Sequence, residues 1–181
     1  MSAMAGTAVR VLFDAETIAE RNRALAAEIK AAAPERLLVI AVLKGSFIFA
    51  ADLIRALHGA GLAPEVEFIS LSSYRAGTVS SGSVTILHDV ESDVRGRDVV
   101  LVDDILESGR TLAYAKDLFA ARRARRVLTC VLLEKPGKRA VELDADFVGF
   151  HCPDLFVVGY GMDVAHKYRQ LPFVGVVEKS I

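Results

Sequence analysis

The 181-residue sequence contains no tryptophan and only two cysteines, and none of its hydrophobic runs is long enough to span a bilayer. A membrane-spanning helix needs roughly 20 consecutive apolar residues, so we expect no membrane partner. Cys130 and Cys152 are too few for a disulfide framework or a cysteine metal site, and we expect two buried free thiols in a reducing compartment. Because Met1–Val9 also lacks the basic and apolar segments of a signal peptide, the expected location is the cytoplasm.

The sequence also lacks an excess of charge of either sign. Its formal net charge is −1, which gives no electrostatic reason to expect a nucleic-acid partner. One local basic cluster, which we interpret as the solvated end of a helix, comprises Arg122, Arg123, Arg125 and Arg126. With 52% hydrophobic and 25% charged residues the composition is that of a globular protein, and its length predicts a single domain over residues 1–181.

Short apolar runs alternate with helical patterns along most of the chain. Asp14 is placed to cap a first helix that ends before Pro34. Two further helices are predicted at 47–57, closed by Gly59, and at 110–121. Strands are predicted at 37–43, 66–71, 84–87, 98–102, 127–133, 147–150, 156–160 and 174–177, and a polar loop at 72–83. This order of strands and helices predicts an α/β fold with a mostly parallel sheet.

The segment Val99–Thr111, VVLVDDILESGRT, combines an aliphatic strand with two adjacent carboxylates, Asp103 and Asp104. Ligands of open α/β sheets bind at the carboxyl ends of the strands, and the hydroxyls, glycine and amides of ESGRT at a helix start suit a phosphate group. Two carboxylates beside a phosphate would repel one another unless a cation intervenes, so the pattern predicts magnesium. An acidic pair alone also fits a solvated strand end or a phosphoacceptor receiver domain. A receiver needs a phosphorylatable aspartate after another strand, and the Lys44-Gly45 turn offers none.

The whole of this run resembles the phosphoribosyl pyrophosphate motif of type I phosphoribosyltransferases. Further segments, in matching order, resemble the hypoxanthine-guanine branch of that family: LKGS at 43–46, SSY at 72–74, Lys135, FVVGYGMD at 156–163 and YR at 168–169. The resemblance extends from about Leu12 to Val177. It implies the type I phosphoribosyltransferase fold, a central mostly parallel sheet flanked by helices with a small hood of C-terminal and N-terminal segments.

The resemblance implies a purine salvage enzyme that transfers the 5-phosphoribosyl group from phosphoribosyl pyrophosphate to hypoxanthine or guanine. The products would be IMP or GMP and pyrophosphate, and the enzyme would be a homo-oligomer, a dimer or tetramer. Two substrate-bridged magnesium ions would be held by Asp103, Asp104 and Asp163. Contacts to the phosphoribosyl and pyrophosphate groups would come from Lys44, Gly45, Asp103, Asp104, Ile105, Leu106, Glu107, Ser108, Gly109, Arg110, Thr111 and Arg169.

The resemblance also assigns a purine site and a lid. Purine-binding residues would be Lys135, which donates to the 6-oxo group, Phe156, which stacks on the ring, Val157 through its backbone, and Asp163. Ser73 and Tyr74 would open a loop that closes over the site and excludes water. Judged singly, Phe156 would be a core residue and Lys135 and Arg169 surface charges; their joint order favours the site.

The implied catalytic residues are Glu107 and Lys135. At position 107 the family usually carries an aspartate near N7 of the purine, proposed as a proton acceptor, and the extra methylene of glutamate could shift the carboxylate by about 1 Å. The family also usually has Glu-Asp where Asp103-Asp104 stands here. The alternative function is a nucleotide-binding regulator on the same fold, which would be expected to show a basic face for RNA or DNA; the net charge of −1 argues against it.

Overall fold

The computed structural model describes residues 8–73 and 84–178. Its main sheet has six strands in the order β4-β3-β2-β5-β6-β7, with every neighbouring pair parallel except β3 and β4. These strands are β2 (Leu38–Leu43), β3 (Glu65–Ser73), β4 (Val84–His88), β5 (Asp98–Leu106), β6 (Arg126–Glu134) and β7 (Phe147–His151). Within these described residues, three helices flank the sheet: α1 (Ala15–Ala31), α2 (Phe47–Gly59) and α3 (Arg110–Ala121).

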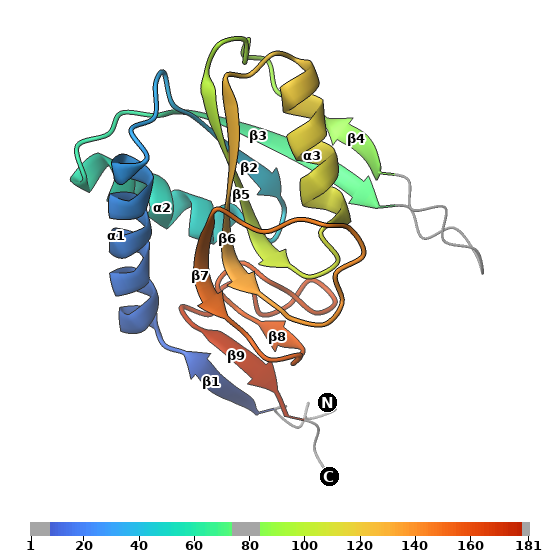
Figure 1. Ribbon diagram of the computed structural model, residues 1–181. Coiled ribbons are helices and arrows are strands. Elements are labelled where there is room, and N and C mark those ends of the chain that lie inside the picture. The colour runs from blue at the N-terminus through green and yellow to red at the C-terminus, as the bar shows by residue number, and fades with distance from the viewer. Residues whose placement is uncertain (1–7, 74–83, 179–181) are drawn as a thin grey trace.

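The two faces of the sheet are covered by different helices (Figure 1), with α1 and α2 on one side and α3 on the other. Successive side chains of a strand point to opposite faces, and β5 follows this rule. Val100 and Val102 pack in the core with α1 and α2, whereas Val99 and Leu101 pack in the core with α3. Because β5 is buried on both faces, it is continuously hydrophobic between its acidic residues, over residues 99–102.

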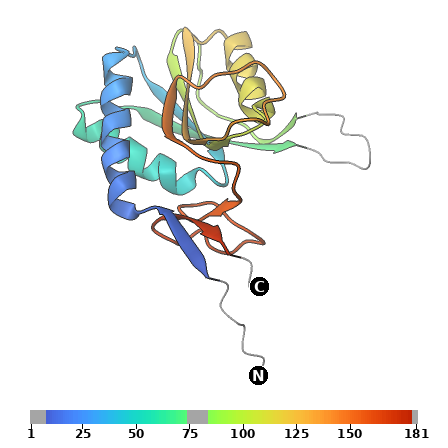
Figure 2. The same cartoon turned by 60° about the horizontal axis from the view of Figure 1, so that its bottom comes forward.

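A second, antiparallel sheet forms a hood over one end of the main sheet. It consists of β1 (Val9–Phe13), β9 (Val174–Val177) and β8 (Val157–Val158), in that order. The hood lies at the end toward which β5 and β6 point (Figure 1), and Figure 2 brings it forward. The segment that follows β5 and the segment that precedes β8 therefore border the same region from opposite sides.

The predicted helices are confirmed. Asp14 caps α1 by accepting the backbone N–H of Thr17 at 2.8 Å, and α3 has the predicted bounds. The prediction that Gly59 closes α2 was wrong, because Gly59 is the last helical residue. The chain instead turns at Gly61, whose φ of +87° is in the left-handed region that glycine adopts readily.

Three strands differ from the sequence prediction in ways that concern the site. Of the strand predicted at 156–160 only Val157–Val158 form β8, because the chain turns with positive φ at 159–161. β3 continues through Ser72 and Ser73, which pair with β4, so the predicted loop begins later than position 72. β5 continues through Leu106, so the acidic pair lies within the strand instead of after it. β1 was not predicted as a strand; its pairing with β9 at the far end of the chain defines it.

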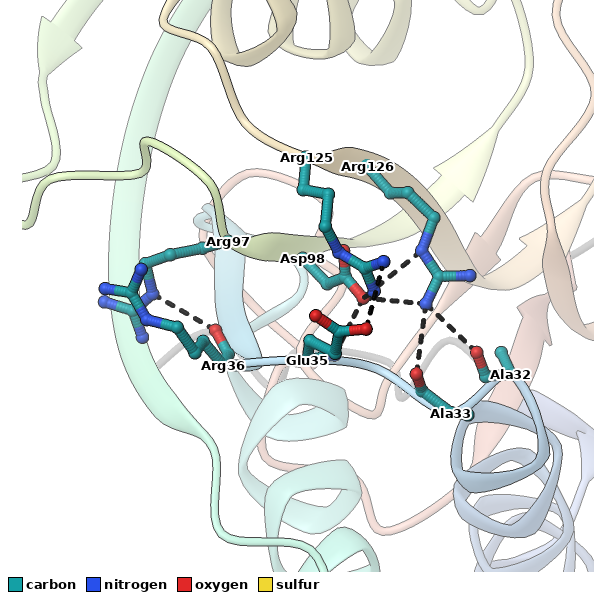
Figure 3. A network of polar contacts seen from close by, with 8 residues as sticks. All are labelled: Ala32, Ala33, Glu35, Arg36, Arg97, Asp98, Arg125 and Arg126. Carbon is teal, nitrogen blue, oxygen red and sulfur yellow. Dashed lines mark hydrogen bonds and ion pairs between the residues drawn. The ribbon is translucent and has the colours of Figure 1, made fainter.

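The interpretation of the basic cluster as a solvated helix end was wrong for three of its four arginines. Arg125 and Arg126 both bind the fully buried carboxylate of Asp98 (Figure 3), with Arg125 Nε 2.8 Å from Oδ1 and Arg126 Nη2 2.7 Å from Oδ2. Arg122 makes a two-pronged pair with Asp89, at 2.8 and 2.6 Å. The cluster therefore ties the start of β6 to the start of β5.

Cys130 and Cys152 are buried free thiols, as predicted. Burial raises the pKa of the Cys130 thiol, which keeps it protonated and unreactive. Of the helices in the described ranges, none combines the length and apolar character that crossing a membrane requires.

Candidate active site

The junction of β5 and α3 borders a cavity of about 330 Å³. Ser108, Gly109 and Thr111 line it at the start of α3. Gly109 is the residue before the helix, with a φ of +79° and no side chain that could cap it, and the Ser108 hydroxyl accepts the Arg110 N–H at 3.4 Å. The first amides of a helix have no intrahelical partner and carry the positive end of its dipole, so this corner of the cavity suits an anion.

The turn between β2 and α2 forms another wall of the same cavity, through Lys44 and Gly45. Ser46 closes the turn by donating its hydroxyl to the Val42 carbonyl at 2.5 Å, and the Leu43–Lys44 peptide is cis. Gly45 lies directly against Asp104, since a Cβ at position 45 would stand 1.9 Å from Asp104 Oδ2. Only glycine lets the turn approach the carboxylate this closely.

Asp103 and Asp104 are bound by backbone amides and form no ion pair among the described residues. Asp103 Oδ1 accepts the Asp104 N–H at 2.9 Å and Asp104 Oδ1 accepts the Ile105 N–H at 2.8 Å, but within 8–73 and 84–178 no ion pair reaches either residue. Burial raises the pKa of both carboxyl groups, and the charge of Asp104 raises that of Asp103 further. A cation here would relieve this repulsion, and carboxylate oxygens are the ligands that magnesium prefers, so the donor set fits the predicted metal.

Asp163 and Arg169 come from the segment that follows β8. Asp163 lines a second cavity that Asp104 also lines, and its Oδ1 is 3.1 Å from Arg169 Nη2. Arg169 donates through Nη1 to the Gly161 carbonyl at 2.6 Å, so it stands behind Asp163 and lines neither cavity. Within the described residues no three acidic, histidine or cysteine side chains converge on one point. Asp103, Asp104 and Asp163 therefore do not form one three-carboxylate site, and a magnesium ion here would need waters and substrate oxygens to complete its coordination.

The second cavity, of about 500 Å³, contains the predicted purine residues. Lys135 is 6% exposed and its Nζ donates to the Leu155 carbonyl at 2.6 Å, so it is no surface charge. Phe156 is 63% exposed, so it is not a core residue and its ring is available for stacking. Val157 is buried in β8, where pairing with Val176 of β9 fixes its backbone.

Glu107 lines both cavities, as do Asp104 and Ile105. Its Oε1 is 3.5 Å from Nζ of Lys138, and its carbonyl accepts from Arg139 Nη1 at 3.0 Å. Sequence reasoning missed Lys138 and Arg139. The basic run that follows Lys135 was the available signal, but nothing local shows that it folds back onto Glu107.

The family of the chain follows from two comparisons. A model of the phosphoribosyl transferase domain matches residues 9–165. The hypoxanthine-guanine phosphoribosyltransferase of Bacillus subtilis is 42% identical over 173 residues, which cover 95% of this chain and 94% of that protein. The chain belongs to the hypoxanthine-guanine phosphoribosyltransferase family.

Solved structures of this family have the same fold. A hypoxanthine phosphoribosyltransferase from Staphylococcus aureus superposes with a TM-score of 0.89 at 35% identity, covering 98% of this chain and 95% of that one. A hypoxanthine-guanine phosphoribosyltransferase from Bacillus anthracis gives a TM-score of 0.84 at 42% identity, covering 92% and 96%. The predicted type I phosphoribosyltransferase fold is confirmed, and the regulator alternative is not favoured.

The remaining predicted site residues fall into three groups. Ile105 and Leu106 belong to β5; Leu106 is buried, and its carbonyl accepts the Lys135 N–H at 3.0 Å, which links the two cavities. Arg110 is the exposed first residue of α3 and lines neither cavity. Ser73 ends β3, and Tyr74, with the rest of the hypoxanthine-guanine family's lid segment, lies outside the described residues.

Proposed function

We propose that this chain transfers the 5-phosphoribosyl group of phosphoribosyl pyrophosphate to hypoxanthine or guanine, and so salvages purines as IMP or GMP with release of pyrophosphate. The observation that carries the proposal is the pair of adjoining cavities on β5. One is polar and bordered by a helix start, the other has a buried lysine and an exposed phenyl ring, and both share Asp104 and Glu107. A phosphorylated sugar and a purine would meet at these shared residues.

The polar cavity holds the phosphoribosyl half. Ser108, Gly109 and Thr111, with the first amides of α3, bind the 5′-phosphate, and Ile105 and Leu106 contribute backbone groups. Lys44 and Gly45 face the pyrophosphate, where positive charge and a close backbone suit a leaving anion. Arg169 supports the same anion from behind Asp163.

Asp103, Asp104 and Asp163 hold magnesium, two ions being expected with the substrate bound. The metal supplies charge neutralisation for pyrophosphate as it departs. The raised pKa values of Asp103 and Asp104 support this role, because the pair keeps both negative charges most easily next to a cation.

The second cavity orients the base. Lys135 donates to the 6-oxo group, Phe156 stacks on the ring, and the backbone of Val157 contacts the ring edge. Glu107, within reach of both cavities, accepts a proton near N7. With the base held in place, its N9 attacks the anomeric carbon of the ribose as the bond to pyrophosphate breaks.

Three further features are part of the proposal and rest on the family resemblance. The chain acts as one domain over residues 1–181, in the cytoplasm and as a homodimer or homotetramer, without nucleic-acid or membrane partners. Ser73 and Tyr74 begin the lid that shields the reacting sugar from water. Light scattering of the purified protein tests the assembly; a monomer at all concentrations would contradict it.

The decisive test of the reaction is a steady-state assay with phosphoribosyl pyrophosphate, magnesium and each of hypoxanthine, guanine and adenine. An ammonium group can donate to a 6-oxo group but offers no acceptor to a 6-amino group, so adenine should be disfavoured by roughly 10⁴-fold in kcat/KM. Lys135→Gln should reduce this ratio, because an amide can present either a donor or an acceptor. No transfer to hypoxanthine, or equal use of adenine, would refute the substrate assignment.

The matched control for Lys135→Gln is Lys30→Gln. Lys30 also donates to a backbone carbonyl, that of Ala60, at 2.6 Å, but lines neither cavity. The control should leave the ratio of hypoxanthine to adenine use unchanged. A similar change in both variants would mean that Lys135 does not recognise position 6.

A further inference from the structure

The turn that follows β8 has an unusual backbone. Gly159, Tyr160 and Gly161 have φ values of +91°, +49° and +97°, a region that costs a residue with a side chain conformational energy. Backbone N–H groups of Tyr160 and Gly161 donate to the carbonyls of Leu171 and Arg169, at 2.9 and 3.0 Å. The flanking glycines suit this geometry, whereas Tyr160 is held in it by contacts of its side chain.

The Tyr160 hydroxyl joins this turn to both helices on the same face of the sheet. It donates to Asp52 Oδ2 of α2 at 2.5 Å and accepts from Asn22 Nδ2 of α1 at 2.9 Å, and the residue is 4% exposed. Burial and the neighbouring Asp52 carboxylate raise the pKa of the phenol, so the hydroxyl remains a donor. The second oxygen of Asp52 accepts from Arg55 at 2.9 Å, which fixes the carboxylate.

The same turn presses against the Lys44-Gly45 turn. A Cβ at Gly161 would lie 2.6 Å from the Gly45 carbonyl oxygen, just as one at Gly45 would lie 1.9 Å from Asp104 Oδ2. Gly161 therefore packs directly against Gly45, and Gly45 packs directly against Asp104. The Gly161 carbonyl in addition accepts from Arg169, which pairs with Asp163.

We propose that Tyr160 is a positioning residue for the phosphoribosyl pyrophosphate half of the site. Its hydroxyl anchors the Gly159–Gly161 turn on α1 and α2. The anchored turn then determines the positions of Arg169 and of the wall formed by Lys44 and Gly45. The inference rests on the proposed function, because these groups are assigned there to pyrophosphate. Tyr160 lines neither cavity on β5, so it acts through its neighbours.

Two of the assigned purine residues are held by contacts that do not involve Tyr160. Lys135 is fixed by the Leu155 carbonyl, and Val157 by pairing with Val176. Loosening the Tyr160 anchor should therefore weaken one half of the site and spare the other. A residue that matters only for stability would not separate the two substrates in this way.

The test is Tyr160→Phe, which removes the hydroxyl and keeps the ring in the core. The expected result is a rise of about tenfold in the KM for phosphoribosyl pyrophosphate and in the calorimetric Kd for magnesium pyrophosphate. The KM for hypoxanthine should change less than about twofold. Asp52→Ala should reproduce the effect and Asp52→Asn should restore most of the wild-type behaviour, since an amide oxygen still accepts the hydroxyl proton.

Ile29→Val is the control, because Ile29 of α1 is buried in the same core and makes none of these hydrogen bonds. Equal changes in both KM values, or the same rise in Ile29→Val, would overturn the inference. If Tyr160→Phe does not fold, Asp52→Ala and Asp52→Asn still test the role of Tyr160. Asp52 is 38% exposed, so its replacement disturbs the core less. A wild-type protein that binds pyrophosphate but transfers nothing to hypoxanthine would refute the proposed function, while the pyrophosphate Kd values would still decide the role of Tyr160.

Discussion

The two ends of β5 carry carboxylates in opposite electrostatic situations. At the start of the strand, Asp98 is fully buried and meets Arg125, Arg126 and the Glu35 N–H (Figure 3). Near its end, Asp103 and Asp104 accept hydrogen bonds from two backbone amides, and no ion pair reaches them within the described ranges. We call the start of β5 the saturated end, because arginines neutralise its carboxylate. We call the other end unsaturated, because no ion pair within the described ranges neutralises its two carboxylates.

The pKa values respond accordingly. Burial alone would raise the pKa of Asp98, but hydrogen bonds from Arg126 and Arg125 outweigh burial and lower it. At Asp103 and Asp104 burial outweighs the backbone hydrogen bonds and, at Asp104, the charge of Arg169, so the pKa of each is raised. A saturated carboxylate stabilises the fold, whereas an unsaturated pair stores repulsion that a ligand can relieve. The difference supports the proposed site at the carboxyl end of the sheet.

Neutralising the unsaturated end should give the largest effect on catalysis. We expect the double variant Asp103→Asn, Asp104→Asn to lose turnover on the order of 10³-fold, because charge on the departing pyrophosphate is no longer neutralised. Its midpoint of thermal unfolding should stay the same or rise, since repulsion between the two carboxylates is gone. Full activity of the wild type in excess chelator, or a clear fall in the unfolding midpoint of the variant, would contradict the comparison.

Neutralising the saturated end should have the reverse outcome. Asp98→Asn should lower the free energy of unfolding by about 3 kcal/mol, because it leaves two arginines beside a neutral amide. Turnover per folded molecule should remain near that of the wild type, and urea unfolding together with the assay measures both. Asp117→Asn, an exposed position on α3, is the control and should change neither quantity.

The contribution of Asp98 should also depend on pH. Its pKa is lower in the folded protein than in the unfolded chain, where aspartate titrates near about 3.9, so protonation favours unfolding. The difference in stability between wild type and Asp98→Asn should be complete above about pH 5 and shrink as the pH falls through about 4. A difference that grows on acidification would show that the arginine pairs do not lower this pKa.

Glu107 is intermediate, since its carboxylate has one cationic neighbour, Lys138, at 3.5 Å. Glu107→Asp restores the residue usual in the family but withdraws the carboxylate by about one methylene from a site built around glutamate. We expect kcat/KM for hypoxanthine to fall by about tenfold with little change in the KM for phosphoribosyl pyrophosphate. An unchanged or increased kcat/KM for hypoxanthine would mean that the site is not built around the longer side chain of glutamate.

The smallest effect is expected at Arg122, because its acidic partner, Asp89, is partly exposed whereas Asp98 is fully buried. Arg122 and Asp89 are each about one-third exposed or more, so solvent screens their attraction. Arg122→Ala should cost about 0.5 kcal/mol of unfolding free energy, against about 3 kcal/mol at Asp98. Equal losses in the two variants would show that burial does not separate these ion pairs.

The sequence by itself determined the features that depend on neighbouring residues. The bounds of α3, the cap of α1 and the buried strands follow from local spacing and capping, which act within a few residues. The segment that carries Asp103, Asp104 and the phosphate loop is likewise continuous. Its predicted binding of magnesium and phosphate therefore follows from one stretch of the sequence. Family resemblance extended this reading to Lys135 and Phe156, which lie on other segments of the chain.

Tertiary structure decided what depends on distant segments meeting. Arg125 is 27 positions from Asp98 in the chain, so a cluster that looked like a solvated helix end proved to be the counter-charge of a buried carboxylate. β1 is a strand because β9 pairs with it, and Gly45 lies where a Cβ would meet the side chain of Asp104 from β5. The Tyr160 anchor spans 108 positions to Asp52. None of these contacts leaves a periodic or local pattern, because each is fixed by the packing of whole elements and by which charges that packing buries together.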